Sequence, residues 1–262
     1  MNEKQNSFST TMTPEEAQKE IVVIRRQLAD LQSQNRAMWT LLAEVSRRLQ
    51  ASSTSIKAAA SSLLDHDIFW DGSNQHEFLE TIDNSVDQSA NLITLMMLAF
   101  RSEANTLEMK PEPHTLQEIL STVLDTIATQ KPEIRFDALL PTVGKPVLVD
   151  YEYLAVGLRL LLEVLVESGM ISSKLKLHLT ESTEYWHLDI LDLRTSIGEA
   201  ITHLCRNRLD NLMLLEHISP ENVLKLFTAS RILHLQNIQM KVQAGNKGEM
   251  VLHLTIPAVF TT

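Results

Sequence analysis

Histidines are the side chains in this sequence whose type and neighbours most suggest a metal-binding or phosphoryl-accepting site. His66 lies between Asp65 and Asp67, and His76 follows within the next stretch of the chain. An imidazole nitrogen can bind a metal ion or accept a phosphoryl group. Adjacent residues do not share a face, however, so we interpret His66 as part of a solvated turn. His76 is interpreted as a residue at the start of a helix.

The other candidates for a reactive or ligand-binding site are weaker. His203 and Cys205 lack the second pair of ligands that a zinc site requires. The stretch GNKG at positions 245–248 is not followed by Lys-Ser or Lys-Thr, so it predicts a hairpin turn and not a phosphate loop. Cys205 is the only cysteine, so no intrachain disulfide is possible. We therefore expect no metal site.

The first element that must position these residues is a long helix. Residues 1–12 are polar and predict a disordered tail, and TPEE at positions 13–16 is a helix-start signal. Apolar residues then recur at alternating steps of three and four, with Asn35 as the one polar member. This repeat predicts a parallel coiled coil over residues 13–43, because two copies of Asn35 can satisfy each other across a dimer. The alternative is a long amphipathic helix packed on its own protein. The seam consists of Ile21, Ile24, Leu28, Leu31, Asn35, Met38, Leu42, Val45 and Leu49.

Residues 44–64 read EVSRRLQASSTSIKAAASSLL, and residues 78–87 read FLETIDNSVD. These stretches resemble the two dimerisation helices of bacterial sensor histidine kinases, whose patterns run VSHELRTPLTSIKGAASLL and YLETIDRSVD. The resemblance implies a helical hairpin over residues 44–106 that pairs with a second copy into a four-helix bundle. Arg47 stands where the family has its phosphoacceptor histidine, and Arg48 stands where it has the neighbouring acid.

The remainder, residues 107–262, alternates helical and strand patterns, with strands expected at 174–180 and 185–193 and a helix near 220–235. The fold class is therefore α+β, and we expect an antiparallel sheet with helices on one face in this part. VDYEYLAVGLRLLLEVL from Val149 and QMKVQAGNKGEMVLHLTIP from Gln239 resemble the ATP-binding catalytic domain of the same kinases.

The resemblance also marks where nucleotide contacts would lie. The two asparagines that serve the metal fall on Leu160 and Val164, and the adenine loop keeps Asp192 but replaces its two glycines by Arg194 and Ser196. The glycine-rich phosphate loop falls on residues 223–226, where Val223 blocks a close backbone approach. Lys225 in that loop is interpreted as a solvated lysine at a helix end. Because Arg47 cannot accept a phosphoryl group either, the resemblance implies an inactive kinase relative, not an enzyme, without nucleotide cofactor or metal.

These observations predict a catalytically inactive signalling scaffold that forms a homodimer and binds a protein partner: a response regulator, an active kinase or another signalling protein. Two alternatives remain open. One is a histidine phosphotransfer protein that uses His66 or His76, and the other is a sensor whose altered pocket binds a different small ligand through Lys225 and Arg194. A net charge of −10 disfavours nucleic acid as a partner. No apolar stretch has the length of a membrane span, so we expect a cytoplasmic protein.

Overall fold

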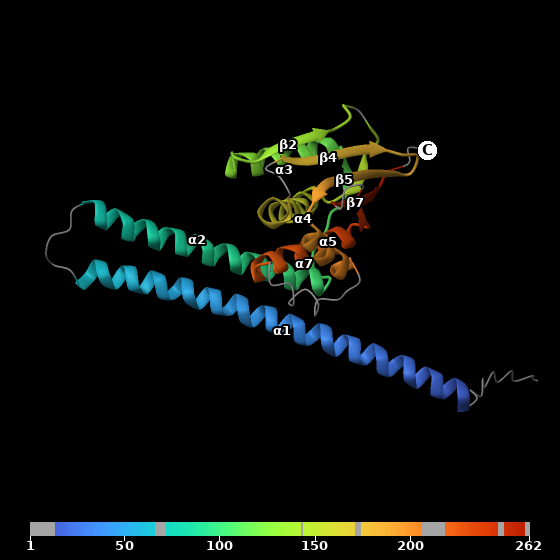
Figure 1. Cartoon of the computed structure of the whole chain (residues 1–262), viewed down its shortest axis with the longest axis horizontal. Helices are drawn as coiled ribbons and strands as arrows, with labels where there is room; N and C mark the ends of the chain where they lie inside the picture. Colours follow the sequence, from blue (N-terminus) through green and yellow to red (C-terminus); the bar gives the residue numbers. More distant parts are fainter. Residues whose placement is uncertain are drawn as a thin grey trace, which may run out of the picture.

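The computed structural model describes residues 14–65, 72–142, 144–170, 174–205, 218–245 and 249–259. Two long helices form an antiparallel hairpin, and a domain of sheet and shorter helices lies against one side of it (Figure 1). The predicted tail at 1–12, Thr13 at the beginning of the predicted helix-start signal, and His66 lie outside the described residues. This α+β architecture, with long helices first and the sheet later in the chain, agrees with the predicted fold class.

The hairpin consists of α1 (Pro14–Asp65) and α2 (Gly72–Glu103). Neither glycine nor proline follows Pro14 within α1, so nothing in the sequence breaks the helix. The two helices pack against each other, and the apolar side chains of the hairpin that are at least nine-tenths buried are Ala37, Leu41, Val45, Ala59, Leu92, Leu95 and Ala99. The predicted boundary at residue 43 falls inside one continuous helix, and the division into a coiled coil and a hairpin stays a prediction.

A serine link joins the two helices near the middle of the hairpin. Ser52 is buried, and its hydroxyl donates a hydrogen bond of 2.6 Å to the backbone oxygen of Ser85. The hydroxyl of Ser89 donates to Ser52 Oγ at 3.0 Å. Ser52 therefore both continues α1 and fixes the register of α1 against α2.

We expect Ser52→Ala to lower the free energy of unfolding by about 1 kcal/mol, the usual effect of losing one buried hydrogen bond. Ser89 then loses one of its two acceptors and keeps only the backbone oxygen of Ser85. Ser89→Ala should therefore add less in the Ser52→Ala background than alone. Urea unfolding of the four chains of this double-mutant cycle measures both effects. Strictly additive changes would contradict the link.

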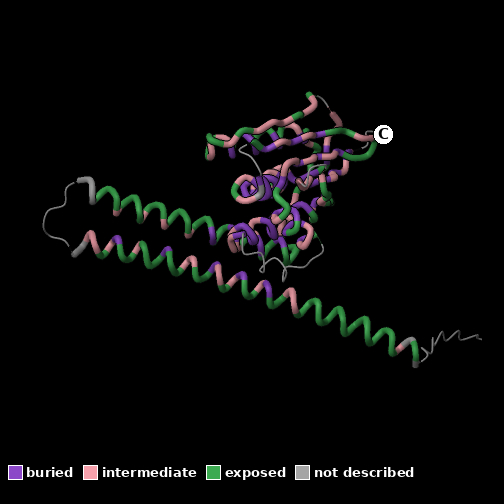
Figure 2. The backbone as a smooth tube through the Cα atoms, viewed as in Figure 1, coloured by how far each residue is buried: buried purple, intermediate pink, exposed green. Residues whose placement is uncertain are grey.

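The N-terminal part of α1 extends beyond its partner helix. Since Ser52 lies opposite Ser85 and Ser89, the end of α2 at Glu103 falls near residue 36 of α1. Roughly 22 residues, or about 33 Å of helix, therefore project from the hairpin. Figure 2 shows this segment as exposed along its length, and its seam residues Ile21, Ile24, Leu28 and Leu31 are 44–62% exposed in the single chain.

The later domain is built on a five-stranded sheet of order β2-β4-β5-β7-β6, with a separate pair β1-β3. In chain order its elements are β1 (Glu112–His114), α3 (Leu116–Gln130), β2 (Arg135–Leu139), β3 (Val147–Val149), α4 (Tyr151–Val164), η1 (Leu165–Gly169), β4 (Lys174–Glu181), β5 (Tyr185–Leu193), α5 (Thr195–Cys205), α7 (Pro220–Leu235), β6 (Gln239–Ala244) and β7 (Met250–Pro257). The expected strands and the expected helix near 220–235 are all present.

The prediction of a wholly antiparallel sheet is wrong at one edge, because β2 and β4 are parallel. Parallel neighbours need a crossover connection, and the segment between β2 and β4 contains α4, which provides it. The remaining strand pairs of the large sheet are antiparallel.

Alternation along the strands directs one face of the sheet toward the helices. Leu175, Leu177 and Leu179 of β4 are buried, whereas Lys174, Lys176 and His178 between them lie on the opposite face. The helices α4, α5 and α7 lie below the sheet in Figure 1, and α7 lies between the sheet and the hairpin. This position makes α7 the element that joins the two parts of the chain.

Candidate functional site

The candidate site is a cleft of about 420 Å³ where the sheet domain meets α2. Ser219 caps α7, since its hydroxyl accepts a hydrogen bond of 3.2 Å from the backbone N–H of Asn222. This cap starts the helix so that Glu221 and Lys225, one turn apart, both face the cleft. Apolar side chains of α2 and α4 form one wall: Leu92, Leu95, Leu98, Val156 and Leu160.

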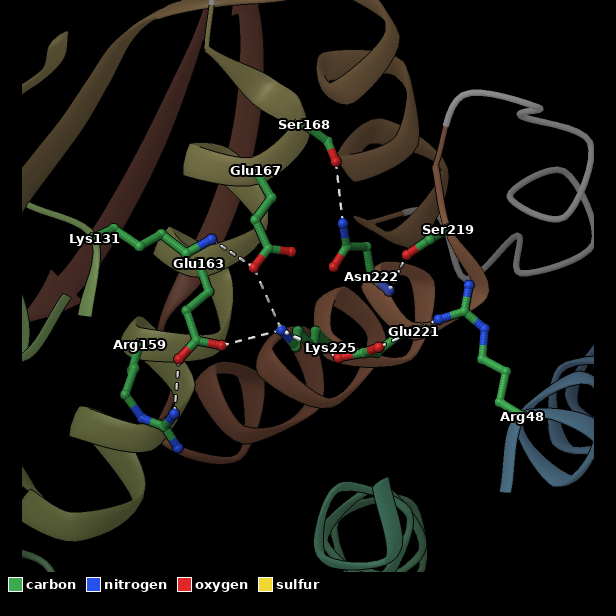
Figure 3. Close-up of polar contacts among 10 residues, drawn as sticks. All are labelled: Arg48, Lys131, Arg159, Glu163, Glu167, Ser168, Ser219, Glu221, Asn222 and Lys225. Carbon is green, nitrogen blue, oxygen red and sulfur yellow. Dashed lines mark hydrogen bonds and ion pairs between the residues drawn. The ribbon is translucent and has the colours of Figure 1, made fainter. Parts of the chain in front are cut away.

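Lys225 lies at the centre of the polar wall (Figure 3). Its Nζ is 3.3 Å from Glu163 Oε2, 3.4 Å from Glu221 Oε1 and 3.8 Å from Glu167 Oε1, and its side chain is only 14% exposed. The three carboxylates come from α4, η1 and α7. One ammonium group therefore holds together three separate elements.

Each of these carboxylates also has a second cation. Arg159 donates a hydrogen bond of 2.7 Å to Glu163, and Lys131 donates one of 2.8 Å to Glu167. On the hairpin side, Arg48 donates one of 3.3 Å to Glu221. Figure 3 shows the resulting chain of contacts, which runs from α1 through α7 to α4 and the end of α3. We call these seven residues the ion network.

The backbone next to the network is unusual. η1 is a π-helical turn, a rare form that occurs often at functional sites. It carries Glu167 and Ser168, and Asn222 Nδ2 donates a hydrogen bond of 3.0 Å to Ser168 Oγ. The turn therefore contacts α7 twice, once through an ion pair and once through a neutral hydrogen bond.

The network shifts the pKa of both kinds of group. Burial opposes the charge of Lys225, but the three carboxylates outweigh it and raise the pKa of its ammonium group above 10.5. Burial likewise opposes the charge of Glu167, but the hydrogen bond from Lys131 and the charge of Lys225 lower the pKa of its carboxyl below 4.5.

These shifts predict a pH window for the stability that the network provides. A raised lysine pKa contributes stability that is present below pH 10.5 and lost as the pH rises through the folded-state value. A lowered glutamate pKa contributes stability that is present above pH 4.5 and lost as the pH falls through the folded-state value. Denaturant unfolding of Lys225→Met across the pH range should show smaller decreases in the free energy of unfolding, both at high pH and at low pH, than the parent chain shows. An identical pH profile in that variant would contradict the assignment.

The structure separates the predicted nucleotide-contact residues. Leu160 and Val164 are buried, and Val223 is buried within α7. Lys225 is in the cleft and is not the solvated lysine that we expected. Only Leu160 and Lys225 of the predicted positions line the cleft.

Asp192 lies elsewhere, on the open face of the sheet. Its backbone has a positive φ of 58° at an irregularity in β5, and its carboxylate forms an ion pair of 2.7 Å with Lys176. Arg194 is exposed beside the start of α5, and Ser196 is half-buried in that helix. Asp192 and Arg194 do not line the cleft with Lys225.

The two hairpin arginines differ in their surroundings. Arg47 is exposed, and its Nε donates a hydrogen bond of 2.9 Å to Glu44 Oε2 on the same helix. Arg48 points toward α7 and joins the ion network through Glu221. Of these two adjacent residues, Arg47 therefore lies in solvent and Arg48 lies in the contact between the hairpin and the sheet domain.

The remaining chemical candidates stay apart from one another. His76 is exposed on α2, and the thiol of Cys205 donates a hydrogen bond of 3.3 Å to the backbone oxygen of Met240. In the described part of the chain, no group of three or more histidines, cysteines or acids could hold a metal ion. Of GNKG, residues 246–248 lie outside the described residues, and Gly245 N–H donates to the backbone oxygen of Glu249 at 2.7 Å.

Sequence reasoning missed the carboxylates that surround Lys225. Two signals were present: Arg159 and Glu163 are four residues apart, as are Glu221 and Lys225, and both spacings allow ion pairs on a helix. The contacts of Glu167 with Lys131 and Lys225 join distant segments, so no local pattern contains them.

A helical hairpin followed by this mixed sheet and its helices defines the class of fold. The histidine kinase AdeS of Acinetobacter baumannii has a similar structure, with a TM-score of 0.57 and 16% identity over 81% of this chain and 98% of that one. ShkA in complex with AMPPNP is similar as well, with a TM-score of 0.57 and 12% identity over 85% of this chain. The match covers 46% of ShkA, so the chain spans about half its length.

The chain therefore has a histidine-kinase fold. A scan against protein-family models and a search of curated proteins gave no match. Within the described residues, no helix is long and apolar enough to cross a membrane.

These comparisons contradict the prediction that the chain is not an enzyme, because the fold that it shares with AdeS is that of a histidine kinase. That prediction rested on the side chains at a few aligned positions, such as Arg47 and Val164. Loss of particular groups does not exclude catalysis by others, so the inference from substituted residues to an inactive protein was wrong.

Proposed function

We propose that this chain is a homodimeric signalling protein with a histidine-kinase fold whose hairpin binds a response regulator. The observation that carries the proposal is an apolar stripe on α2, formed by Leu79, Val86, Ile93 and Phe100 at intervals of seven residues. All four side chains are 47–50% exposed in the single chain. A regular apolar stripe on the outside of a helix is typical of a surface that a second helix covers.

α1 carries a matching stripe of partly exposed apolar residues. It lies on the same side of the hairpin as the stripe of α2, and this supports that side as the dimer contact surface. On α2 the exposed stripe follows by one residue the line that faces α1, which includes Leu92 and Ala99. On α1 the partly exposed Leu42 follows the buried Leu41 in the same way. In antiparallel helices an equal offset places both stripes on one side. Two hairpins that meet through this side form a four-helix bundle.

The projecting part of α1 completes the proposed dimer. Its exposed seam from Ile21 to Leu31 would pair with the second copy as a parallel coiled coil, and Asn35 would meet its own copy at the end of that seam. The hairpin contact and the coiled-coil contact would both be made with one second copy of the chain, related by a two-fold axis, so neither requires a further protein.

The proposed partner site lies on the other side of the hairpin. Near its tip, a groove of about 530 Å³ runs between the helices and is lined by Ser55, Ala58, Ala59, Ser62, Glu77, Phe78 and Thr81. The small side chains of α1 allow a partner helix to approach closely. We propose that the response regulator binds here, and that the signalling takes place in the cytoplasm.

Calorimetric titration of the full chain with purified receiver domains of response regulators tests this proposal. At least one receiver domain should bind, and Ala58→Arg, which fills the groove, should abolish its binding. Trp39→Arg, at an exposed position outside the groove, should leave it unchanged. Failure of every receiver domain to bind, or equal loss in both variants, would refute the proposed site.

The exposure of His76 on α2, next to the groove residue Glu77, favours a second candidate, phosphotransfer. In that reaction an imidazole nitrogen of His76 forms a P–N bond, the acyl-phosphate P–O bond of a receiver aspartate breaks, and the imidazole proton goes to solvent. A labelled phosphoreceiver should then transfer label to the chain but not to His76→Ala. Label that persists in His76→Ala, or no label in the parent chain, would remove this candidate.

A further inference from the structure

A second cavity, separate from the cleft around Lys225, lies at the other end of α7. It has a volume of about 300 Å³ and lies where the end of α5 and the last turns of α7 meet the start of β6. This volume is at the lower end of the range for ligand pockets, about 300–1,000 Å³. None of its lining residues belongs to the cleft or to the groove near the hairpin tip.

The lining of this cavity is partly apolar and partly basic. Leu204, Ile238 and Met240 are its apolar residues. The polar residues of the lining all carry hydrogen-bond donors: Ser230, Arg231, His234 and Gln239. Among the described residues no carboxylate lines this cavity, in contrast to the three that surround Lys225 in the cleft. The permanently charged guanidinium of Arg231 therefore gives the lining a positive charge.

Arg231 has hydrogen-bond donors that the protein does not use. Its Nε pairs with Glu103 of α2, which does not line the cavity. Within the described part of the chain, its two terminal nitrogens form no ion pair or hydrogen bond. The guanidinium carbon lies 5.7 Å from the centre of the Phe227 ring, a contact that helps to fix the group in place. A guanidinium held in this way can bind a carboxylate through two parallel N–H groups.

The backbone at the end of α7 is also compatible with a bound anion. The last carbonyl groups of a helix carry negative partial charge, and free carbonyls would repel an anion. Here Leu233 O accepts hydrogen bonds from the N–H groups of Gln236 at 3.1 Å and Ile238 at 3.0 Å, and His234 O accepts one from Asn237 at 3.0 Å. These two carbonyl groups are therefore already satisfied within the turn that follows the helix.

We propose that this cavity binds a small monocarboxylate with an apolar body. The carboxylate pairs with the terminal N–H groups of Arg231, and the hydrocarbon part contacts Leu204, Ile238 and Met240. One permanent cation matches one negative charge, and the apolar residues disfavour a ligand that is charged on every side. The proposal concerns a site outside the cleft, and it does not rest on the dimer or on the partner proposed above.

Cys205, the only cysteine, lines the cavity and can report whether it is occupied. Its thiol donates to the backbone oxygen of Met240, and burial raises the pKa of the thiol, so alkylation by iodoacetamide should be slow enough to follow by mass spectrometry. Benzoate, phenylacetate or hexanoate at millimolar concentration should slow the alkylation of the full chain severalfold. Benzamide, which has the shape of benzoate without its charge, should not.

The two halves of one ion pair provide matched variants. Arg231→Gln removes the proposed carboxylate partner and should weaken binding of the protecting carboxylate roughly ten- to hundredfold, the range for a lost hydrogen bond to a charged group. Glu103→Gln breaks the same ion pair but keeps the guanidinium and removes a nearby negative charge, so it should make binding tighter. Calorimetric titration of the full-length variants measures both changes.

Three results would overturn the proposal. The first is an alkylation rate that none of the three carboxylates changes, and the second is equal protection by benzamide and benzoate. The third is weaker binding in both Arg231→Gln and Glu103→Gln, because it would show that the ion pair supports the fold of this region and that the guanidinium does not itself bind the carboxylate.

Discussion

Replacing Val86 and Ile93 by glutamate should dissociate the proposed dimer. Each side chain contributes about 1.5–3 kcal/mol when it is fully buried, and the pair occurs once in each of two chains. Each glutamate also places an unpaired negative charge in the apolar contact surface, and this lowers the free energy of dimer formation further. The dissociation constant of the double variant should therefore rise by at least about a thousandfold, as measured by dilution of a fluorescently labelled chain.

A polar control on the same helix sharpens this test. Asn84 and Gln88 are exposed on α2 but do not belong to the stripe. The double change Asn84→Glu and Gln88→Glu adds the same charge and should leave the dissociation constant within a few fold of the parent value. A dimer that tolerates glutamate at 86 and 93 as well as it does at 84 and 88 would show that the stripe is not the contact surface.

Lys225→Met should produce the second large effect, on the stability of the sheet domain. The variant keeps the length and the apolar part of the side chain but leaves the carboxylates of Glu163, Glu167 and Glu221 facing one another without the central cation. Removing one member of a buried ion pair costs about 3–5 kcal/mol, and the partial exposure of two of the three carboxylates reduces the expected loss to about 2 kcal/mol.

Urea unfolding of the full chain, followed by circular dichroism, measures this loss. Lys57→Met provides the control, because it makes the same change at an exposed position of α1. If the two variants were equally stable, Lys225 would not hold the cleft together, and the structural role of the network would have to be abandoned.

Periodicity explains why most of the fold could be predicted from the sequence. Alternating and helical patterns are local, so they placed strands at 174–180 and 185–193 and a helix near 220–235, close to the observed bounds. Strand pairing is not local. The parallel arrangement of β2 and β4 depends on where β4 returns to the sheet after α4, and the short pattern of β2 does not contain that information.

The site was harder to predict because its residues come from distant elements. Lys225 looked like a solvated residue at a helix end, since its own segment offers only Glu221 as a nearby carboxylate. Glu163 and Glu167 reach it only because α4 and η1 pack against α7. The contact of Asp192 was equally hidden: the carboxylate pairs with Lys176 of β4, beside a local irregularity of β5 that the sequence does not reveal.

Sedimentation equilibrium of the unmodified chain over a wide range of concentrations tests the central claim most directly. The proposal of a homodimeric signalling protein predicts a mass twice that of the 29.6-kDa chain, with dissociation only at the lowest concentrations. The mass of a single chain at every concentration would contradict it, because the stripes of α1 and α2 would then remain uncovered in solution.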